Sequence, residues 1–366
     1  MKVPFLDLAA ELDTDAVLAA VREQLEACSF VGGPAVAEFE ARYARLCGTR
    51  FAVGLNSGTD AIFLALKALG IGPGDEVITA PNSFIASAGA VVAAGATPVF
   101  SDVGPDYQLD PELLDGAITP RTKALLPVHL TGTLGDMDAL LEVAGRHGLA
   151  LIEDAAQSIQ ATYRGRPAGS FGVAGCFSLH PLKNLNVAGD GGMLSTDSEE
   201  LRDALLRLRN HGLVTRDEAP TFGYNSRLDS IQAAIGSVVL ERIDEITARR
   251  RELAARYDAG LASLAPQVLL PPRPPKVEGV YQTYVVQCER RDALRAALRE
   301  AGVGTKVHYP RPIHLMTCGR QLGYGPGDFP VCEAQAERIV SLPVHHHLSD
   351  AQVDHVIEQI AAFYGA

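Results

Sequence analysis

Apolar runs of strand length alternate with segments of helical periodicity from about residue 51 onward. Strands are predicted at FAVGL, EVITA, TPVFSDV, KALLPVHL and LALIEDA, with a helical pattern between each pair. Regular alternation of helices with continuously apolar strands is typical of a mainly parallel sheet that is covered by helices on both faces. The sequence therefore predicts an α/β fold, and this prediction limits where a functional site can lie.

Polar loops follow the predicted strands. In open α/β sheets, ligands bind beyond the carboxyl ends of the strands, so these loops are expected to line a site. The loops are NSGT at 56–59, PNSF at 81–84, HLTG at 129–132 and EDAAQ at 153–157.

The second half of the chain has a different pattern. From Ser230 a long helical pattern runs to about residue 261 and predicts one helix that joins two domains. After the proline-rich connector at 271–276, strands are predicted at YQTYVVQC and GTKVHYP, and helices at RDALRAALREAG and AQVDHVIEQIAAFY. We expect a large domain of residues 1–245 and a smaller α+β domain of residues 246–366.

Charge and composition exclude several classes of partner. The net charge is −12, and acidic and basic residues are interspersed without a basic run, which argues against nucleic acid and anionic membranes. The longest uncharged run, 78–101, is broken by prolines and glycines, and the N-terminus lacks the layout of a signal peptide. Six scattered cysteines without zinc-type spacing predict reduced thiols. We expect a cytoplasmic protein.

Single residues in the loops and turns are ambiguous when each is taken alone. Asp154 ends an apolar strand, where a buried carboxylate needs a cationic partner, either in a structural ion pair or in a site. Gly58 and Thr59 open a predicted helix, either as part of an ordinary cap or as a phosphate site. Lys183 is either a surface lysine or a reactive amine, and Asn225 lies in a turn that has no distinctive pattern.

Many blocks of the chain, taken together and in order, resemble the DegT/StrS sugar aminotransferases, within the fold-type-I group of pyridoxal phosphate (PLP) enzymes. The blocks are VPFLDL, FVGGP, NSGTDA, PNSFIASA, TPVFSDV, ITPRTKALLPVHLTG, IEDAAQ, GSFG, KNLNVAGDGG, LRNHG, GYNSRLDSIQAA, VHYPRPIHL, GDFPVCE and SLPVH. The resemblance implies a PLP-dependent transferase fold of type I: a large domain with a mainly parallel, seven-stranded type of sheet, and a smaller C-terminal α+β domain.

The resemblance also implies roles for named residues in a site that holds pyridoxal 5′-phosphate. Lys183 would be the Schiff-base lysine and proton carrier, and Asp154 would pair with the pyridine nitrogen of the cofactor. Gln157 would bind the phenolic oxygen, and Phe84 would stack on the ring. The phosphate would be held by Gly58, Thr59 and Ser178, with Asn225 from the neighbouring subunit of a homodimer.

Substrate-binding residues are expected in two further turns. Arg227 lies beside Asn225, and VHYPRPIHL offers His308, Tyr309 and His314. No metal site is expected. Three consecutive histidines at 345–347 cannot all face one ion from a strand or turn, so they are predicted to form a surface turn.

The resemblance implies a keto sugar, most often nucleotide-linked, as acceptor and an amino acid, usually L-glutamate, as donor. GDGG at 189–192 and the NSRLD turn resemble members that act at the sugar C3. His180 stands where those members usually have tyrosine. Transaminases of a keto-octulosonate also resemble this block, although they tend to have tryptophan at the position of Ala188. A non-nucleotide keto sugar or cyclitol, a non-transaminating PLP enzyme and a regulator therefore remain as alternatives. Lys183 disfavours the non-transaminating enzyme, and the joint retention of Lys183, Asp154, Gln157 and the phosphate loop disfavours a regulator.

Overall fold

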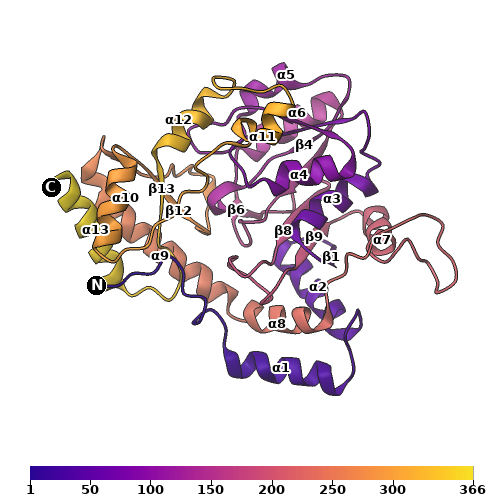
Figure 1. Ribbon diagram of the computed structural model, residues 1–366. Coiled ribbons are helices and arrows are strands. Elements are labelled where there is room, and N and C mark those ends of the chain that lie inside the picture. The colour runs from indigo at the N-terminus through magenta and orange to yellow at the C-terminus, as the bar shows by residue number, and fades with distance from the viewer. Residues whose placement is uncertain (366) are drawn as a thin grey trace.

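The computed structural model describes residues 1–365 and contains a seven-stranded sheet at its centre (Figure 1). The strand order is β1-β9-β8-β5-β4-β2-β3. Every neighbouring pair is parallel except those of β9, which runs antiparallel to β1 and β8. The predicted mainly parallel sheet is confirmed. Its strands are β1 (Phe51–Leu55), β2 (Glu76–Thr79), β3 (Thr97–Phe100), β4 (Thr122–Leu126), β5 (Ala150–Asp154), β8 (Ala174–Ser178) and β9 (Gly192–Thr196).

Helices cover both faces of this sheet, because successive side chains of a strand point to opposite faces. Ile78 and Leu125 belong to the core beneath α2, α6 and α8. Their neighbours Val77 and Leu126 belong to the core beneath α3, α4 and α7. The helices of this domain are α1 (Thr14–Glu26), α2 (Pro34–Cys47), α3 (Gly58–Ala68), α4 (Ala86–Ala94), α5 (Leu114–Ala117), α6 (Met137–His147), α7 (Glu199–Leu208) and α8 (Ser230–Leu240).

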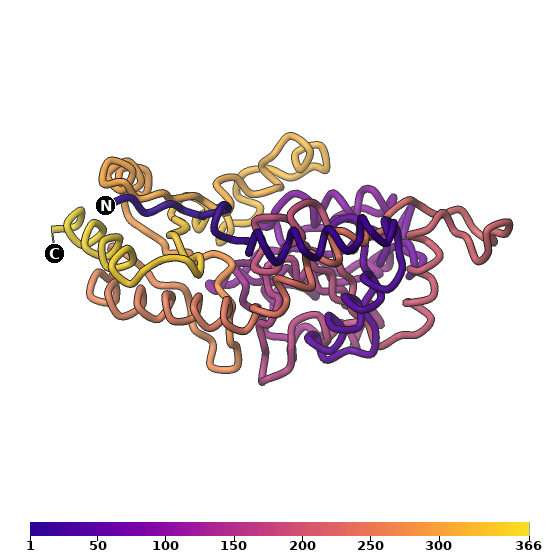
Figure 2. Tube along the Cα trace, turned by 90° about the horizontal axis from the view of Figure 1, so that it is seen from below, coloured from indigo at the N-terminus to yellow at the C-terminus, as the bar shows by residue number. Residues whose placement is uncertain are grey.

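A second, smaller unit is built around a three-stranded antiparallel sheet with the order β10-β12-β13. Its apolar core also includes Val3, so the N-terminal segment packs into this unit and lies near the last helix of the chain (Figure 2). Its elements are β10 (Val268–Leu269), β12 (Tyr284–Cys288), β13 (Ile339–Leu342), α9 (Ile243–Leu261), α10 (Arg291–Glu300) and α13 (Asp350–Tyr364).

Short elements complete the fold between the two units. A small sheet has the order β11-β6-β7. Ile313, Phe329 and Cys332 return to the core of the large sheet, so part of the C-terminal half packs there. These elements are β6 (Thr162–Tyr163), β7 (Arg166–Pro167), β11 (Val277–Glu278), α11 (Thr317–Gln321) and α12 (Pro330–Arg338).

Two details of the predicted second half are wrong. The single long helix is two helices, α8 and α9, because Arg242 has φ −107° and ψ 5°, outside helical geometry. Nothing in the periodicity of the sequence marks this break, since neither proline nor glycine occurs there. The predicted strand GTKVHYP is absent among the described residues: only Lys306 pairs, with Ser341, and prolines at 310 and 312 offer no further N–H donors. Among residues 1–365, no helix combines the length and apolar character that crossing a membrane requires.

Candidate active site

The N-terminus of α3 lies at the carboxyl edge of the sheet and meets the end of β8. Ser57 caps the helix by accepting a hydrogen bond from the N–H of Asp60 at 3.0 Å. A Cβ at Gly58 would lie 2.8 Å from the Cβ of Ser178, so only glycine allows this close approach. The first turn of a helix leaves backbone N–H groups unpaired and carries a partial positive charge. The local sequence therefore builds an anion site.

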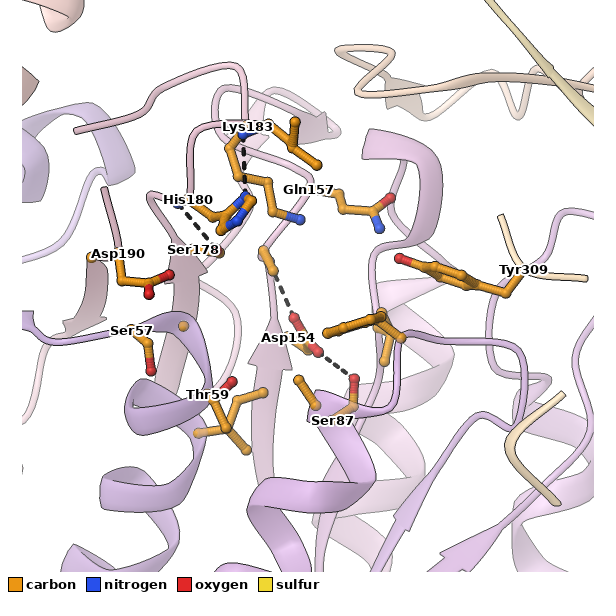
Figure 3. A pocket seen from close by; sticks show the side chains of 18 residues that line it. Ser57, Thr59, Ser87, Asp154, Gln157, Ser178, His180, Lys183, Asp190 and Tyr309 are labelled. Atoms are coloured by element: carbon orange, nitrogen blue, oxygen red, sulfur yellow. Dashed lines mark hydrogen bonds between the residues drawn. The ribbon is translucent and has the colours of Figure 1, made fainter. Parts of the chain in front are cut away.

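Asp154 ends β5 and is 5% exposed. Its carboxylate accepts hydrogen bonds from the hydroxyl of Ser87 at 2.6 Å and from the N–H of Ala156 at 3.2 Å. Ser83 in turn donates its hydroxyl to Ser87 at 3.1 Å. These contacts fix the carboxylate at the floor of the cavity, where the side chain of Asp154 is in view beside Ser87 (Figure 3).

Lys183 lies in the connection between β8 and β9. Its N–H donates to the carbonyl of His180 at 2.9 Å, and the next residue, Asn184, is buried and donates its N–H to Gln282 Oε1 at 3.1 Å. Burial lowers the pKa of the Lys183 amine, and the nearby Asp154 carboxylate opposes that shift. A lowered pKa increases the neutral fraction of the amine, which is the form that acts as nucleophile and base.

Gln157 and two aromatic residues complete the walls. Gln157 Oε1 accepts a hydrogen bond from the N–H of Thr131 at 2.8 Å, which leaves its amide N–H groups for a ligand. Phe84 is 56% exposed, and its ring centroid lies 5.8 Å from that of Tyr309. Burial, with the Asp154 carboxylate nearby, raises the pKa of Tyr309 to about 12, so its hydroxyl keeps its proton at neutral pH.

These residues line one cavity of about 340 Å³, within the usual range for ligand sites (Figure 3). Of the residues named from sequence, the structure brings together Gly58, Thr59, Phe84, Asp154, Gln157, Ser178, Lys183 and Tyr309.

Four residues named from sequence do not line this cavity. Asn225 is exposed on the loop after α7, and Arg227 donates to Asn210 Oδ1 at 2.7 Å. His308 shares a 2.8 Å hydrogen bond with Ser341. Burial and the charge of Lys183 lower the pKa of His308 to about 4. His314 is fully buried and bonds Glu333 at 2.9 Å, so in this protomer it supports the fold of its turn.

Sequence reasoning missed Ser87 and Asp190, both of which line the cavity. Ser87 lies in α4, far along the chain from Asp154, and no pattern pairs the two residues before the fold is known. Asp190 belongs to the GDGG block, which predicted the position aminated on the sugar but did not mark Asp190 as a residue of the site. Its carbonyl accepts from Gln232 Nε2 at 2.6 Å, and this contact holds the turn after Lys183.

A half-buried lysine and a buried carboxylate share one cavity with a helix N-terminus, an arrangement that suits a PLP-dependent enzyme. The chain belongs to the DegT/DnrJ/EryC1/StrS aminotransferase family, whose sequence pattern matches residues 12–361. It is a PLP-dependent aminotransferase.

Relatives and solved structures agree over nearly the whole chain. The chain is 46% identical to a dTDP-3-amino-3,4,6-trideoxy-alpha-D-glucose transaminase from Streptomyces venezuelae, over 98% of this chain and 95% of the relative. It is 40% identical to a protein of Geobacillus stearothermophilus described as a pleiotropic regulatory protein, over 100% and 99% of the two chains. The crystal structure of S. venezuelae DesV in complex with a ketimine intermediate matches with a TM-score of 0.97 at 45% identity, over 100% and 99% of the chains.

The residues present fit the cofactor. The α3 N-terminus and the cradle that a Cβ at Gly58 would fill suit a phosphate, and the exposed Phe84 ring is free to cover an aromatic ligand. The buried carboxylate of Asp154 suits a protonated ring nitrogen. The Lys183 amine lies within electrostatic reach of this carboxylate.

Proposed function

We propose that this enzyme transfers an amino group from an amino acid, L-glutamate, to the C3 keto group of a nucleotide-linked hexose or deoxyhexose. The observation that carries amination is the cavity shared by Lys183 and Asp154. The choice of a nucleotide-linked 3-keto sugar is supported by the activity that the name of the Streptomyces relative states and by the GDGG block, whose Asp190 lines the cavity.

When bound, PLP supplies an electron sink for charge that develops beside its ring. In this proposal Asp154 keeps a proton on the ring nitrogen, since an ionised carboxylate fixed by Ser87 and Ala156 cannot turn away. Gln157 donates an amide N–H to the phenolic oxygen. Because Gln157 Oε1 is already held by the N–H of Thr131, the orientation of the amide is set in advance.

Lys183 moves the protons. In its neutral form, Nζ takes a proton from the α-carbon of the amino donor and later delivers a proton to the sugar carbon that carried the keto group. The lowered pKa of Lys183 supports this role, because an amine with an ordinary pKa stays protonated at neutral pH. Borohydride reduction followed by peptide mapping should place the phosphopyridoxyl label on Lys183. A label on another lysine would remove this role.

The phosphate is assigned to Gly58, Thr59 and Ser178, where the helix N-terminus and a hydroxyl converge. Phe84 and Tyr309 lie side by side at the opposite wall and would cover the ring and exclude water. His308, next to Tyr309, is proposed to contact substrate through a small movement of its turn, whereas His314 acts only through that turn.

We further propose a homodimer with shared sites. Asn225 lies on the loop between α7 and α8, which extends away from the body of the protomer in both views (Figures 1 and 2). Phe222 on the same loop is 99% exposed. An extended loop with an exposed aromatic ring is suited to a partner subunit. Asn225 would reach the partner's phosphate site, and Arg227 the partner's substrate.

Mixed dimers test the shared site. Lys183→Ala and Asn225→Ala proteins should each be impaired, and their mixture should regain activity, because one site of the mixed dimer has both residues intact. Subunit exchange without recovery would place Asn225 in its own protomer's site or outside any site.

Arg227→Ala should raise KM for the keto sugar far more than KM for the amino donor.

The substrate is tested in two half-reactions. Glutamate should transfer its amino group to the bound cofactor and so give the amino form of the enzyme, which is detected as a change in the absorption spectrum. A panel should then offer this form nucleotide-linked 3-keto and 4-keto sugars, a keto-octulosonate and a keto cyclitol. If the original spectrum returns fastest with a nucleotide-linked 3-keto sugar, the result supports the proposal. If an acceptor without a nucleotide reacts fastest, the substrate is instead a non-nucleotide keto sugar or cyclitol.

The description of the Geobacillus relative as a regulatory protein does not alter this proposal, because the lysine, carboxylate and amide needed for amino transfer are all retained and share one cavity. We also propose that the enzyme works in the cytoplasm. Free thiols, of which Cys28 and Cys318 are exposed, support a reducing compartment.

A further inference from the structure

The loop between β13 and α13 carries three consecutive histidines beneath the N-terminal segment. His345 is 3% exposed, and its Nε2 lies 3.3 Å from the carbonyl oxygen of Pro4. The prediction of a surface turn is therefore wrong, because residues before α1 cover these histidines. This coverage also brings Glu11 close to His346.

Several polar atoms in this cluster are buried without a hydrogen-bond partner among residues 1–365. They are Glu11 Oε1, Nδ1 of His345, both ring nitrogens of His346 and Nε2 of His347. The side chains of Glu11 and His346 are each only 6% exposed. Native proteins rarely leave so many buried polar atoms unpaired at one place, so an additional ligand is expected here.

The same atoms have the spacing of a metal site. Ligand atoms of Glu11, His346 and His347 all lie within 4.8 Å of one another. His346 Nδ1 is 3.9 Å from Glu11 Oε2, and the two histidine ring centroids are 3.9 Å apart. Around tetrahedral zinc, donor atoms are roughly 3.4 Å apart, as bonds of about 2.1 Å require. Binding would require side-chain rotations that separate the two imidazole rings and bring the three donor atoms to this spacing.

We propose that Glu11, His346 and His347 bind a divalent transition-metal ion, zinc by the chemistry of this donor set, which ties the N-terminal segment to the C-terminal unit. Two imidazoles and one carboxylate suit zinc and leave a fourth position for water. His345 is not a ligand, because its ring lies 6.3 Å from that of His347 and faces the carbonyl of Pro4.

Some charged groups around the cluster favour the binding of a cation, and others oppose it. Burial lowers the pKa of His346 to about 3, so this imidazole is neutral, as a metal ligand must be. Burial raises the pKa of Glu11. The guanidinium groups of Arg250 and Arg242 oppose a further cation, whereas the carboxylate of Asp7 favours one. The Arg250 guanidinium is itself held by the carbonyl of Tyr281 at 3.1 Å.

None of the three residues lines the cavity that holds Lys183, so the expected effect is on stability. The N-terminal segment is otherwise attached through Val3, which bridges Val303, through contacts of His345 with Pro4 and of Gln352 with Lys2, and through α1 on α8. Zinc would add an attachment immediately before α1.

The test uses the full-length, PLP-loaded enzyme. After chelation and dialysis, zinc is titrated, bound zinc per chain is measured by mass spectrometry of the metal, and Tm is recorded with and without zinc. We expect about one zinc per chain and a rise in Tm. Glu11→Gln, His346→Gln and His347→Gln should each lower zinc affinity by at least about tenfold and remove the zinc-dependent rise.

His355→Gln is the matched control, because it removes a half-buried histidine of the same unit that bonds the carbonyl of Ala301 at 3.2 Å. It should keep zinc binding. His346→Leu separates metal binding from packing: without zinc it should be at least as stable as the wild type, since no hydrogen bond is lost. Wild-type enzyme that retains no more zinc than the triple Gln variant, or ligand variants that keep the zinc-dependent rise in Tm, would overturn the site. Water would then account for the unpaired atoms.

Discussion

Two adjacent carboxylates at the end of β5 differ in how many partners they have. Glu153 is fully buried and accepts hydrogen bonds from the N–H groups of Gly169, Phe171 and Gly172 at 2.7 to 3.1 Å, and it bonds His129 at 2.9 Å. Asp154 faces the cavity and accepts from Ser87 and from one backbone N–H.

The two side chains point to opposite faces of the strand, because the side-chain period of a strand is two. Glu153 has its oxygens saturated by donors of the protein, so it can stabilise only the fold. Asp154 keeps acceptor capacity for a ligand. The number of internal partners, not burial or residue type, separates a structural carboxylate from a functional one here.

The largest expected effect is on activity, from Asp154→Asn. The hydroxyl of Ser87 can rotate and accept a hydrogen bond from the new amide, so the free energy of unfolding should change by less than about 1 kcal/mol. An amide cannot hold a proton on the ring nitrogen, so kcat should fall by roughly 10²–10³-fold while PLP still binds. Near-normal turnover would contradict the role of Asp154.

Glu153→Gln is expected to lower the stability of the fold while leaving activity nearly unchanged. Backbone N–H groups cannot rotate to accept a bond, so an amide NH₂ would face donors at Gly169 or at Phe171 and Gly172. The free energy of unfolding, measured in urea, should fall by about 3 kcal/mol. The rate of the glutamate half-reaction per folded site should stay within about threefold of the wild type. Equal stability losses in the two variants would remove the distinction.

The sequence predicted the first five strands of the large sheet, but not β8 and β9, for a physical reason. In 51–157 each strand and helix carries its own periodicity, so β1 to β5 and the loops after them could be found locally. The cofactor residues followed from a resemblance of many blocks and not from periodicity. Periodicity placed Asp154 in a site loop but could not distinguish it from Glu153, because the partners of both come from distant segments.

What the sequence did not predict depends on packing between distant segments. Ser87 reaches Asp154 across 67 positions, and Glu11 meets His346 from the opposite end of the chain. Helix α9 likewise crosses from one core to the other: Ile243 belongs to the large core, whereas Leu253 belongs to the core of the small unit. No local pattern encodes these contacts.

The smallest expected effect on activity comes from a substitution at Ser87, which donates a hydrogen bond to Asp154 and not to Glu153. Ser87→Ala removes one of the two hydrogen bonds of Asp154 and leaves the carboxylate less well oriented and a weaker partner for the ring nitrogen. We expect kcat to fall about tenfold, which corresponds to one hydrogen bond to a charged group, with little change in KM for glutamate. Ser87→Thr keeps a hydroxyl and should restore most of the rate.

Ser83→Ala is the matched control for this last prediction, because Ser83 bonds Ser87 and not Asp154. Its effect on kcat should be no more than about twofold. The pH titration of the cofactor absorption adds a readout that packing alone would not move: it should shift in Ser87→Ala and stay in place in Ser83→Ala. If Ser87→Ala lowers only Tm, the serine acts on the fold, and Asp154 is oriented by the strand and by Ala156 alone.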